Sequence, residues 1–220
     1  LGEKQVPEDA YYGIQTLRGF ENFHNLSGIT IGHYPKYVKS LAMVKWAAAK
    51  ANQELGILPD DIANAIIKAC EEIIDGKYQD QFPVDLIQGG AGTSTNMNIN
   101  EVVANIALEI LGHKKGEYQY CHPNNHVNLS QSTNDVFPTA FKLAFIFNNE
   151  DLLSHLKLLV KAFHTKGEEF KDVIKMGRTQ LQDAVPMTVG QEFEAFAVTL
   201  SEEIERLTEN SKLFLEVNMG

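Results

Sequence analysis

One apolar pattern constrains the fold of this chain more than any other feature. Between Thr188 and Val217, apolar side chains recur at every third or fourth position, with one skipped turn at Ser211. That spacing gathers them on one face of a helix, which spans about 45 Å at 1.5 Å per residue. Such a length is too great for the core of a small monomer and is typical of helical bundles and coiled seams. The sequence therefore predicts a long helix that needs partner helices.

Two segments further upstream have the same spacing and clear ends. One runs from Pro35, which suits a first helical turn, to Gly56, and the other runs from Pro59 to Gly76. We expect an antiparallel helical pair that serves as scaffold, with Cys70 in its core.

The pattern is less regular elsewhere. Residues 139–176 have helical spacing that we interpret as two helices separated near Asn148 and Asn149. Residues 1–34 mix turn formers with aromatic residues and show no sustained period, so we expect an ordered, loop-rich segment with short strands at most.

Charge and composition exclude several kinds of partner. The 220 residues carry 19 Lys and Arg against 29 Asp and Glu, a formal net charge of -10, and no basic cluster, so no nucleic-acid partner is expected. No apolar run is long enough to cross a bilayer, and the first residues lack the apolar segment of a signal peptide. The two cysteines are far apart and imply neither a disulfide framework nor a metal site. We expect a soluble protein of the cytoplasm, with no membrane partner.

A first polar island covers residues 89–101. Three glycines allow a tight backbone path, three hydroxyl residues from Thr93 to Thr95 follow, and an apolar helical pattern then runs from Val102 to a stop at Gly112. A loop that feeds a helix N-terminus in this way suits a carboxylate or a phosphate. The alternative is that one of the hydroxyl residues only caps the helix.

A second polar island covers residues 122–135, where Asn, Ser, Thr and His are too dense to build an apolar core. We interpret it as a loop in which Ser132, Thr133 and Asn134 are suited to holding a carboxylate and an amino group. The alternative is a turn that caps a helix beginning near Val136. His122 and His126 have the spacing of a metal pair on a helix, but Pro123 and the Asn residues argue against helix and no third ligand follows, so no metal is expected.

A third polar island, residues 177–186, precedes the long helix. The islands, together with Val102, contain the segments Gly92-Thr93-Ser94-Thr95-Asn96-Met97-Asn98-Ile99-Asn100-Glu101-Val102, His122-Pro123-Asn124-Asn125-His126-Val127-Asn128, Ser130-Gln131-Ser132-Thr133-Asn134-Asp135 and Gly177-Arg178-Thr179-Gln180-Leu181-Gln182-Asp183-Ala184-Val185-Pro186. In these segments and their order the chain resembles the fumarase/aspartase superfamily. The resemblance implies a mainly α fold, with a loop-rich N-terminal helical domain over residues 1–130 and the first long helices of a central bundle, incomplete, over residues 131–220. It also implies a homotetramer whose active sites are shared between subunits.

Two features are similar to the aspartase branch of that superfamily. Tyr11-Tyr12-Gly13 precedes Thr16-Leu17-Arg18, where fumarases tend to have a Trp-Gly pair and Thr-Gln-Arg, and Gln180 stands where the fumarase pattern has a water-activating His. This branch implies reversible elimination of ammonia from L-aspartate to give fumarate. The C3 proton is removed and an aci-carboxylate forms, without a metal or organic cofactor. Loss of the imidazole suits that reaction, because no water molecule has to be activated.

The resemblance assigns roles to individual residues. Thr93, Ser132 and Thr133 would stabilise the developing negative charge. Asn134 and Gln180 would hold the substrate amino group, and Thr179 would contact the other carboxylate. The expected catalytic residues are thus Thr133 and Gln180. The segment His122, Pro123, Asn124 and Asn125 resembles a secondary anion site of fumarases, and Arg18 is a weaker candidate for substrate or structural support.

The family's catalytic base, a serine on a mobile loop, has no match in these 220 residues. Residues 1–220 are therefore expected to be inactive alone and to self-associate, whether they are a fragment or a truncated product. Two alternatives stay open: a fumarate hydratase, and a non-catalytic helical oligomerisation fragment.

Overall fold

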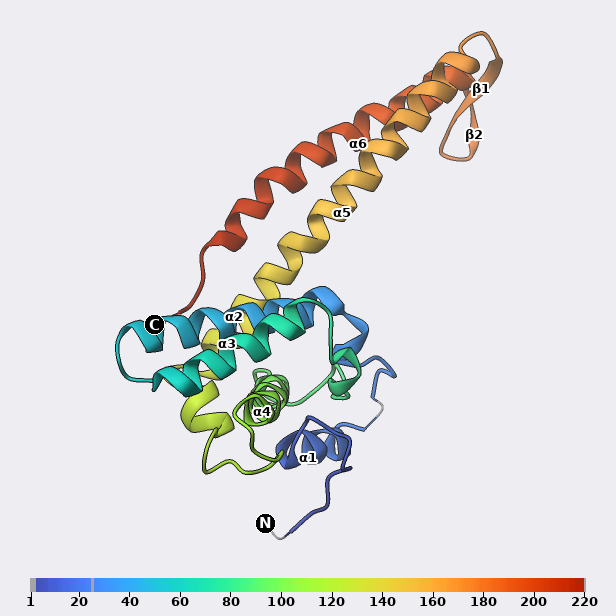
Figure 1. Ribbon diagram of the computed structural model, residues 1–220. Coiled ribbons are helices and arrows are strands. Elements are labelled where there is room, and N and C mark those ends of the chain that lie inside the picture. Colours follow the sequence, from blue (N-terminus) through green and yellow to red (C-terminus); the bar gives the residue numbers. More distant parts are fainter. Residues whose placement is uncertain (1–2, 25, 220) are drawn as a thin grey trace. The chain divides into compact units, whose positions relative to one another are not determined.

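The structure is a computed structural model that describes residues 3–24 and 26–219 (Figure 1). Its main elements are α1 (Ile14–Asn22), α2 (Pro35–Glu54), α3 (Asp60–Ile74), α4 (Thr93–Ile110), α5 (Thr133–Glu169), β1 (Ile174–Thr179), β2 (Gln182–Thr188) and α6 (Val189–Ser211). Short 3-10 turns lie at Ile31–His33, Gln79–Gln81 and Lys212–Leu215, and a π-helical turn lies at Pro123–Val127. The prediction of a mainly α fold is confirmed.

The chain forms two compact units. Residues 1–144 with 217–220 make the first, and residues 145–216 make the second, so α5 contributes to both. The domain boundary expected after residue 130 lies inside the first unit. No helix among the described residues is long and apolar enough to cross a membrane.

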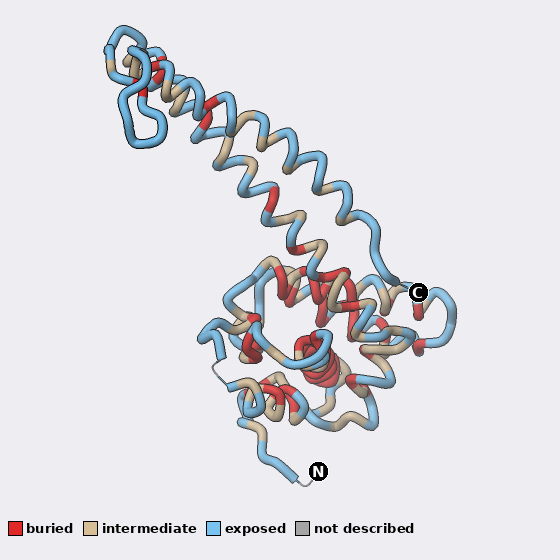
Figure 2. Tube along the Cα trace, turned by 180° about the vertical axis from the view of Figure 1, so that it is seen from behind, coloured by how far each residue is buried: buried red, intermediate tan, exposed pale blue. Residues whose placement is uncertain are grey.

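The core of the first unit is built around α4. From Ile99 to Leu108 every residue of this helix is buried, and α2 and α3 pack as neighbours with α3 also against α4. Figure 2 shows this concentration of buried positions in the helix that is seen end-on. The predicted pair α2 and α3 is confirmed, and Cys70 is buried between their apolar turns. Because α4 is packed on all sides, the residues of its first turn are held in fixed positions.

The second unit is a helical hairpin (Figure 1). Phe163 of α5 lies 5.9 Å from Phe193 and 5.7 Å from Phe196 of α6, measured between ring centroids. At Gly190 a Cβ would come within 2.4 Å of the Gly167 carbonyl oxygen, so only glycine allows the helices this approach. Strands β1 and β2 form an antiparallel pair between the two helices in sequence.

Three expectations about the elements were wrong. The helix predicted to break at Asn148 and Asn149 continues from Thr133 to Glu169, because the buried Asn149 faces α6 and donates Nδ2–H to the Leu207 carbonyl oxygen at 3.2 Å. Residues 1–34 contain the helix α1. The long helix predicted over 188–217 is α-helical only from Val189 to Ser211 and then tightens to a 3-10 turn.

Candidate functional site

The first island is helical for most of its length. α4 already begins at Thr93, and Gly92, with a φ of 85°, is the residue before its first turn. No hydroxyl of the island caps the described helix, so the capping alternative is wrong. The Gln88 side chain takes that place, since its Oε1 accepts the Thr95 N–H at 3.1 Å while its Nε2 donates to Thr95 Oγ1 at 2.9 Å.

This arrangement leaves donors at the start of α4. Within the described part of the chain, the backbone N–H groups of Thr93 and Ser94 have no hydrogen-bond acceptor, as expected for the first turn of a helix. The Thr93 side chain is exposed. An anionic group at this end would meet two open N–H donors, a hydroxyl and the positive end of the helix dipole.

Gly92 brings the first and second islands together. A Cβ at this position would lie 2.1 Å from Cδ2 of Phe137, so a side chain cannot be accommodated without moving the start of α5. The positive φ of Gly92 also favours glycine here, because residues with a side chain rarely adopt such a φ. The glycine therefore lets the first turns of α4 and α5 touch.

In the second island, Ser132 caps α5. Its Oγ accepts the Asn134 N–H at 3.1 Å, and its own N–H donates to Asp135 Oδ2 at 2.8 Å. The capping interpretation is thus confirmed for Ser132, although a capping hydroxyl can still donate its proton to a ligand. Thr133 differs, because its Oγ1 accepts a hydrogen bond from Asn96 Nδ2 at 3.1 Å.

The part of this island predicted to be non-helical contains the π-helical turn Pro123–Val127. His122 Nδ1 accepts the N–H groups of Asn124 at 3.0 Å and Asn125 at 3.2 Å, and His126 Nδ1 accepts the His122 N–H at 2.8 Å. These bonds hold the turn, which the sequence pattern did not reveal. Burial, then the neighbouring His122, lowers the pKa of His126. No group of three His, Cys, Asp or Glu residues suited to a metal occurs among the described positions.

A buried lysine lies close to the second island, on a helix that the sequence analysis interpreted as scaffold without singling this residue out. Lys45 of α2 is fully buried, and its Nζ donates to Asn128 Oδ1 at 2.8 Å and to Gln131 Oε1 at 3.0 Å. Burial lowers the pKa of Lys45 to about 7. No carboxylate pairs with it among residues 3–24 and 26–219. The signal in the sequence was its position four residues after Leu41, on the inner face of the helix.

Glu101 ties α1 to α4. Its carboxylate accepts the N–H groups of Gly13, Gln15 and Thr16 at 2.9 to 3.0 Å, and the Thr16 hydroxyl at 2.6 Å. A buried carboxylate at a helix N-terminus satisfies orphan donors and interacts favourably with the dipole. Glu101, the last residue of the first island, is therefore structural. It holds α1, the helix that carries Arg18, against α4.

The remaining two predicted residues lie in the second unit. Thr179 ends β1, and Gln180 with Leu181 forms a two-residue turn in which both have positive φ, 51° and 63°. Such a turn matches the twist of an antiparallel pair but normally favours Asn or Gly. Thr179 and Gln180 are exposed. The structure thus groups Thr93, Ser132, Thr133 and Asn134 in one unit and Thr179 and Gln180 in the other.

Comparison with known proteins identifies the family. A family model described as Lyase matches residues 2–220. The chain belongs to this lyase family. The aspartate ammonia-lyase of Pseudomonas aeruginosa is 61% identical over 221 residues, which cover 100% of this chain and 46% of that protein. The chain therefore spans less than half the length of this curated relative.

Solved structures of the lyase family share the fold. The fumarate lyase:delta crystallin from Brucella melitensis in native form has a TM-score of 0.94 and 58% identity, with 99% of this chain and 49% of that chain covered. The class II fumarase from Schistosoma mansoni has a TM-score of 0.87 and 39% identity, with 96% and 44% covered.

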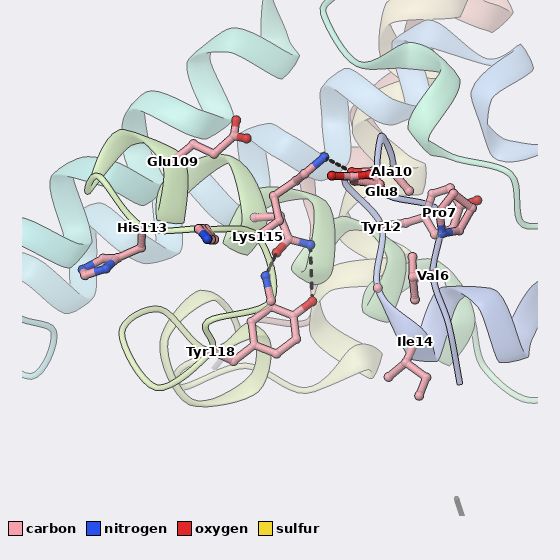
Figure 3. A pocket seen from close by; sticks show the side chains of 14 residues that line it. Val6, Pro7, Glu8, Ala10, Tyr12, Ile14, Glu109, His113, Lys115 and Tyr118 are labelled. Carbon is pink, nitrogen blue, oxygen red and sulfur yellow. Dashed lines mark hydrogen bonds between the residues drawn. The ribbon is translucent and has the colours of Figure 1, made fainter. Parts of the chain in front are cut away.

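A cavity of about 600 Å³ in this lyase-family chain lies away from the predicted residues (Figure 3). It is lined by the segment around Glu8 and Tyr12 and by the end of α4 with the loop that follows, including Glu109 and Lys115. The Lys115 ammonium donates to the Glu8 carbonyl oxygen at 2.7 Å. None of the six predicted substrate-binding residues lines this cavity.

The chemistry of the six residues is uniform. They are hydroxyl and amide side chains, and none is charged or basic enough to remove a proton from carbon. In a site of this lyase family they can bind anions and stabilise developing charge.

Proposed function

We propose that the natural protein catalyses the reversible elimination of ammonia from L-aspartate to give fumarate. The observation that carries this proposal is the 61% identity to an aspartate ammonia-lyase over the whole chain. Gln180 adds to it, since an amide there cannot activate water as an imidazole can. The alternative is a fumarate hydratase, which the 39% identity and shared fold of a class II fumarase favour.

The reaction places clear demands on the site. A base takes the proton from C3, and the electron pair of that C–H bond moves toward the adjacent carboxylate to give an aci-carboxylate. The pair then forms the C2–C3 double bond while the C2–N bond breaks and its electrons leave with nitrogen. Donors are needed most where the negative charge peaks.

The six predicted residues supply hydrogen-bond donors and do not include a base. The open N–H groups and hydroxyl at Thr93, together with Ser132 and Thr133, suit the carboxylate that gains charge. Asn134 and Gln180 have amide groups suited to the departing amine, and Thr179 has a hydroxyl suited to the second carboxylate. The segment from His122 to Asn125 is proposed as a secondary anion site.

Assembly and location belong to the same proposal. The resemblance to the fumarase/aspartase superfamily supports a homotetramer whose active sites are shared between subunits. Large apolar side chains exposed on α5 and α6, including Leu158 and Phe196, suit helix packing between subunits. The composition suits the cytoplasm.

The test measures both products from two substrates. The natural protein is incubated with L-aspartate and separately with L-malate, and fumarate and ammonia are quantified. We expect equal amounts of fumarate and ammonia from L-aspartate and no fumarate from L-malate. Fumarate from malate alone would establish the hydratase, and no product from either would favour a non-catalytic role.

A further inference from the structure

The hydroxyl of Thr133 stands at the end of a chain of hydrogen bonds that begins at a buried lysine. Lys45 Nζ donates to Asn128 Oδ1 at 2.8 Å. Asn96 Nδ2 donates to the same oxygen at 3.1 Å and also to Thr133 Oγ1 at 3.1 Å. The chain joins α2, the second island and α4 to the first residue of α5.

The direction of each bond follows from the chemistry of its neighbour. Lys45 presents protons, so Asn128 must turn its oxygen and not its amide nitrogen toward it. Asn128 Nδ2 donates to the Gln131 carbonyl oxygen at 2.8 Å, which a reversed amide would be unable to do. Because Asn128 presents an oxygen, Asn96 must present Nδ2, and this group also faces Thr133.

Thr133 Oγ1 is therefore an acceptor on its inner side, and its own proton must point elsewhere. Thr133 is only half-buried, and the described residues offer that proton no acceptor. A hydroxyl whose acceptor side is occupied in this way is prepared to donate outward.

The network also carries a cost. Asn96 Oδ1 and Asn100 Oδ1 are buried and have no hydrogen-bond partner in the described structure. Leaving such groups unpaired typically costs about 1–3 kcal/mol each. A network that served only packing would be better built from apolar side chains, so its polarity points to a role beyond stability.

We infer that Asn96 is a positioning residue that directs the Thr133 hydroxyl proton to the substrate carboxylate on which charge develops, with Asn128 and Lys45 holding Asn96 in place. This inference rests on the proposed function, since it needs a substrate that gains negative charge at a carboxylate. Asn96 itself touches Thr133 and not the reacting atoms.

The test compares three substitutions in the natural protein. Asn96→Asp keeps the shape, but a carboxylate accepts the Thr133 proton and turns it inward. Asn96→Leu removes the donor without capturing the proton, and Thr133→Val removes the hydroxyl. We expect Asn96→Asp and Thr133→Val each to lower kcat on the order of 100-fold with KM little changed, and Asn96→Leu to lower it less.

A double-mutant cycle separates positioning from general damage. The Asn96→Asp, Thr133→Val double variant should be no slower than Thr133→Val alone, because both changes remove the same donated proton. The matched control is Asn98→Asp, an identical change at a buried position of α4 whose Nδ2 donates to the Gln81 carbonyl oxygen at 3.0 Å. It should lower the melting temperature and leave kcat per folded molecule unchanged.

The inference is overturned if the kcat losses of Asn96→Asp and Thr133→Val multiply in the double variant, which means that they are additive in free energy. It is also overturned if Asn96→Leu is as slow as Asn96→Asp. If Asn96→Asp does not fold, a double-mutant cycle of Asn96→Leu and Thr133→Val tests the inference instead. Losses of kcat that are additive in free energy in that cycle would contradict it. If the wild-type protein makes no fumarate from aspartate, the proposed function itself is wrong. If the wild type is active and the losses of the variants are additive in free energy, only the role of Asn96 is wrong.

Discussion

At the residue scale, Gly92 makes the sharpest demand on the sequence. Alanine there would hold a φ of 85° and place its Cβ 2.1 Å from Phe137 Cδ2. The left-handed conformation and the overpacking together cost about 2–5 kcal/mol. We predict that Gly92→Ala markedly lowers the melting temperature of the natural protein in calorimetry, and lowers activity because the first turns of α4 and α5 separate.

The control for Gly92 lies at the other end of the same helix. Gly112 has a similar φ of 83°, but a Cβ there meets nothing within 4 Å. Gly112→Ala should cost only about 1–2 kcal/mol, from backbone conformation alone. Equal losses of melting temperature for the two variants would show that contact with Phe137 is unimportant.

Lys45 gives the stability a defined pH dependence. Its pKa falls from the ordinary 10.5 to about 7 on folding, so between these values the unfolded chain binds more protons than the folded one. Stability contributed by this group is then fully present above pH 10.5 and is lost as the pH falls through about 7. The neighbouring Cys70 thiol stays neutral over this range, because burial raises its pKa well above the usual value.

We therefore predict that raising the pH from 7 to 9 increases the wild-type stability by about 2 kcal/mol relative to Lys45→Met. Urea unfolding of both proteins at the two pH values measures the difference. Lys39→Met, a half-buried change on the same helix, should retain the wild-type pH response. The same response in Lys45→Met as in wild type would assign it to another group.

At the element scale, the hairpin of β1 and β2 presents Gln180 at an exposed turn. We predict that Gln180→His does not make the natural protein hydrate fumarate, because water activation requires an imidazole that is oriented as well as present. Malate formed from fumarate is the quantity to measure, with aspartate elimination as the reference. Robust hydration by this single variant would contradict the proposed handling of the amine.

The elements that the sequence predicted well are those whose ends are locally encoded. Pro35 and Gly56 bracket α2, and Pro59 and Gly76 bracket α3, because proline and glycine act through their own backbone conformations. By contrast, α1 has no side-chain cap, and its first N–H groups are satisfied by Glu101, which lies 88 residues from Gly13. No local pattern reveals a partner at that distance.

Part of the candidate site could also be predicted from the sequence, and part could not. The hydroxyl and amide islands were visible because their polarity interrupts apolar spacing, and the contact of Asn96 with Thr133 joins two of them. Lys45 was missed, since a lysine on a helix normally extends to solvent and only the packed structure shows that it does not.

At the scale of the whole molecule, the second unit exposes an apolar surface that favours association with other helices. Within the second unit, the large apolar side chains exposed on α5 and α6 are Phe145, Leu152, Leu158, Leu159, Phe196 and Val198. We predict that a polypeptide of residues 1–220 expressed alone self-associates and forms no fumarate from aspartate. Size-exclusion chromatography with light scattering tests the first part, where a monodisperse monomer would contradict it, and an activity assay tests the second.

The central claim concerns the reaction, and the reverse direction tests it most directly. The natural protein is incubated with fumarate and ammonium in D₂O, and the products are followed by proton NMR. If elimination proceeds through C3 proton removal, the reverse reaction gives aspartate that carries one deuterium at C3, and no malate. Malate as the product, or aspartate without deuterium at C3, would contradict the account.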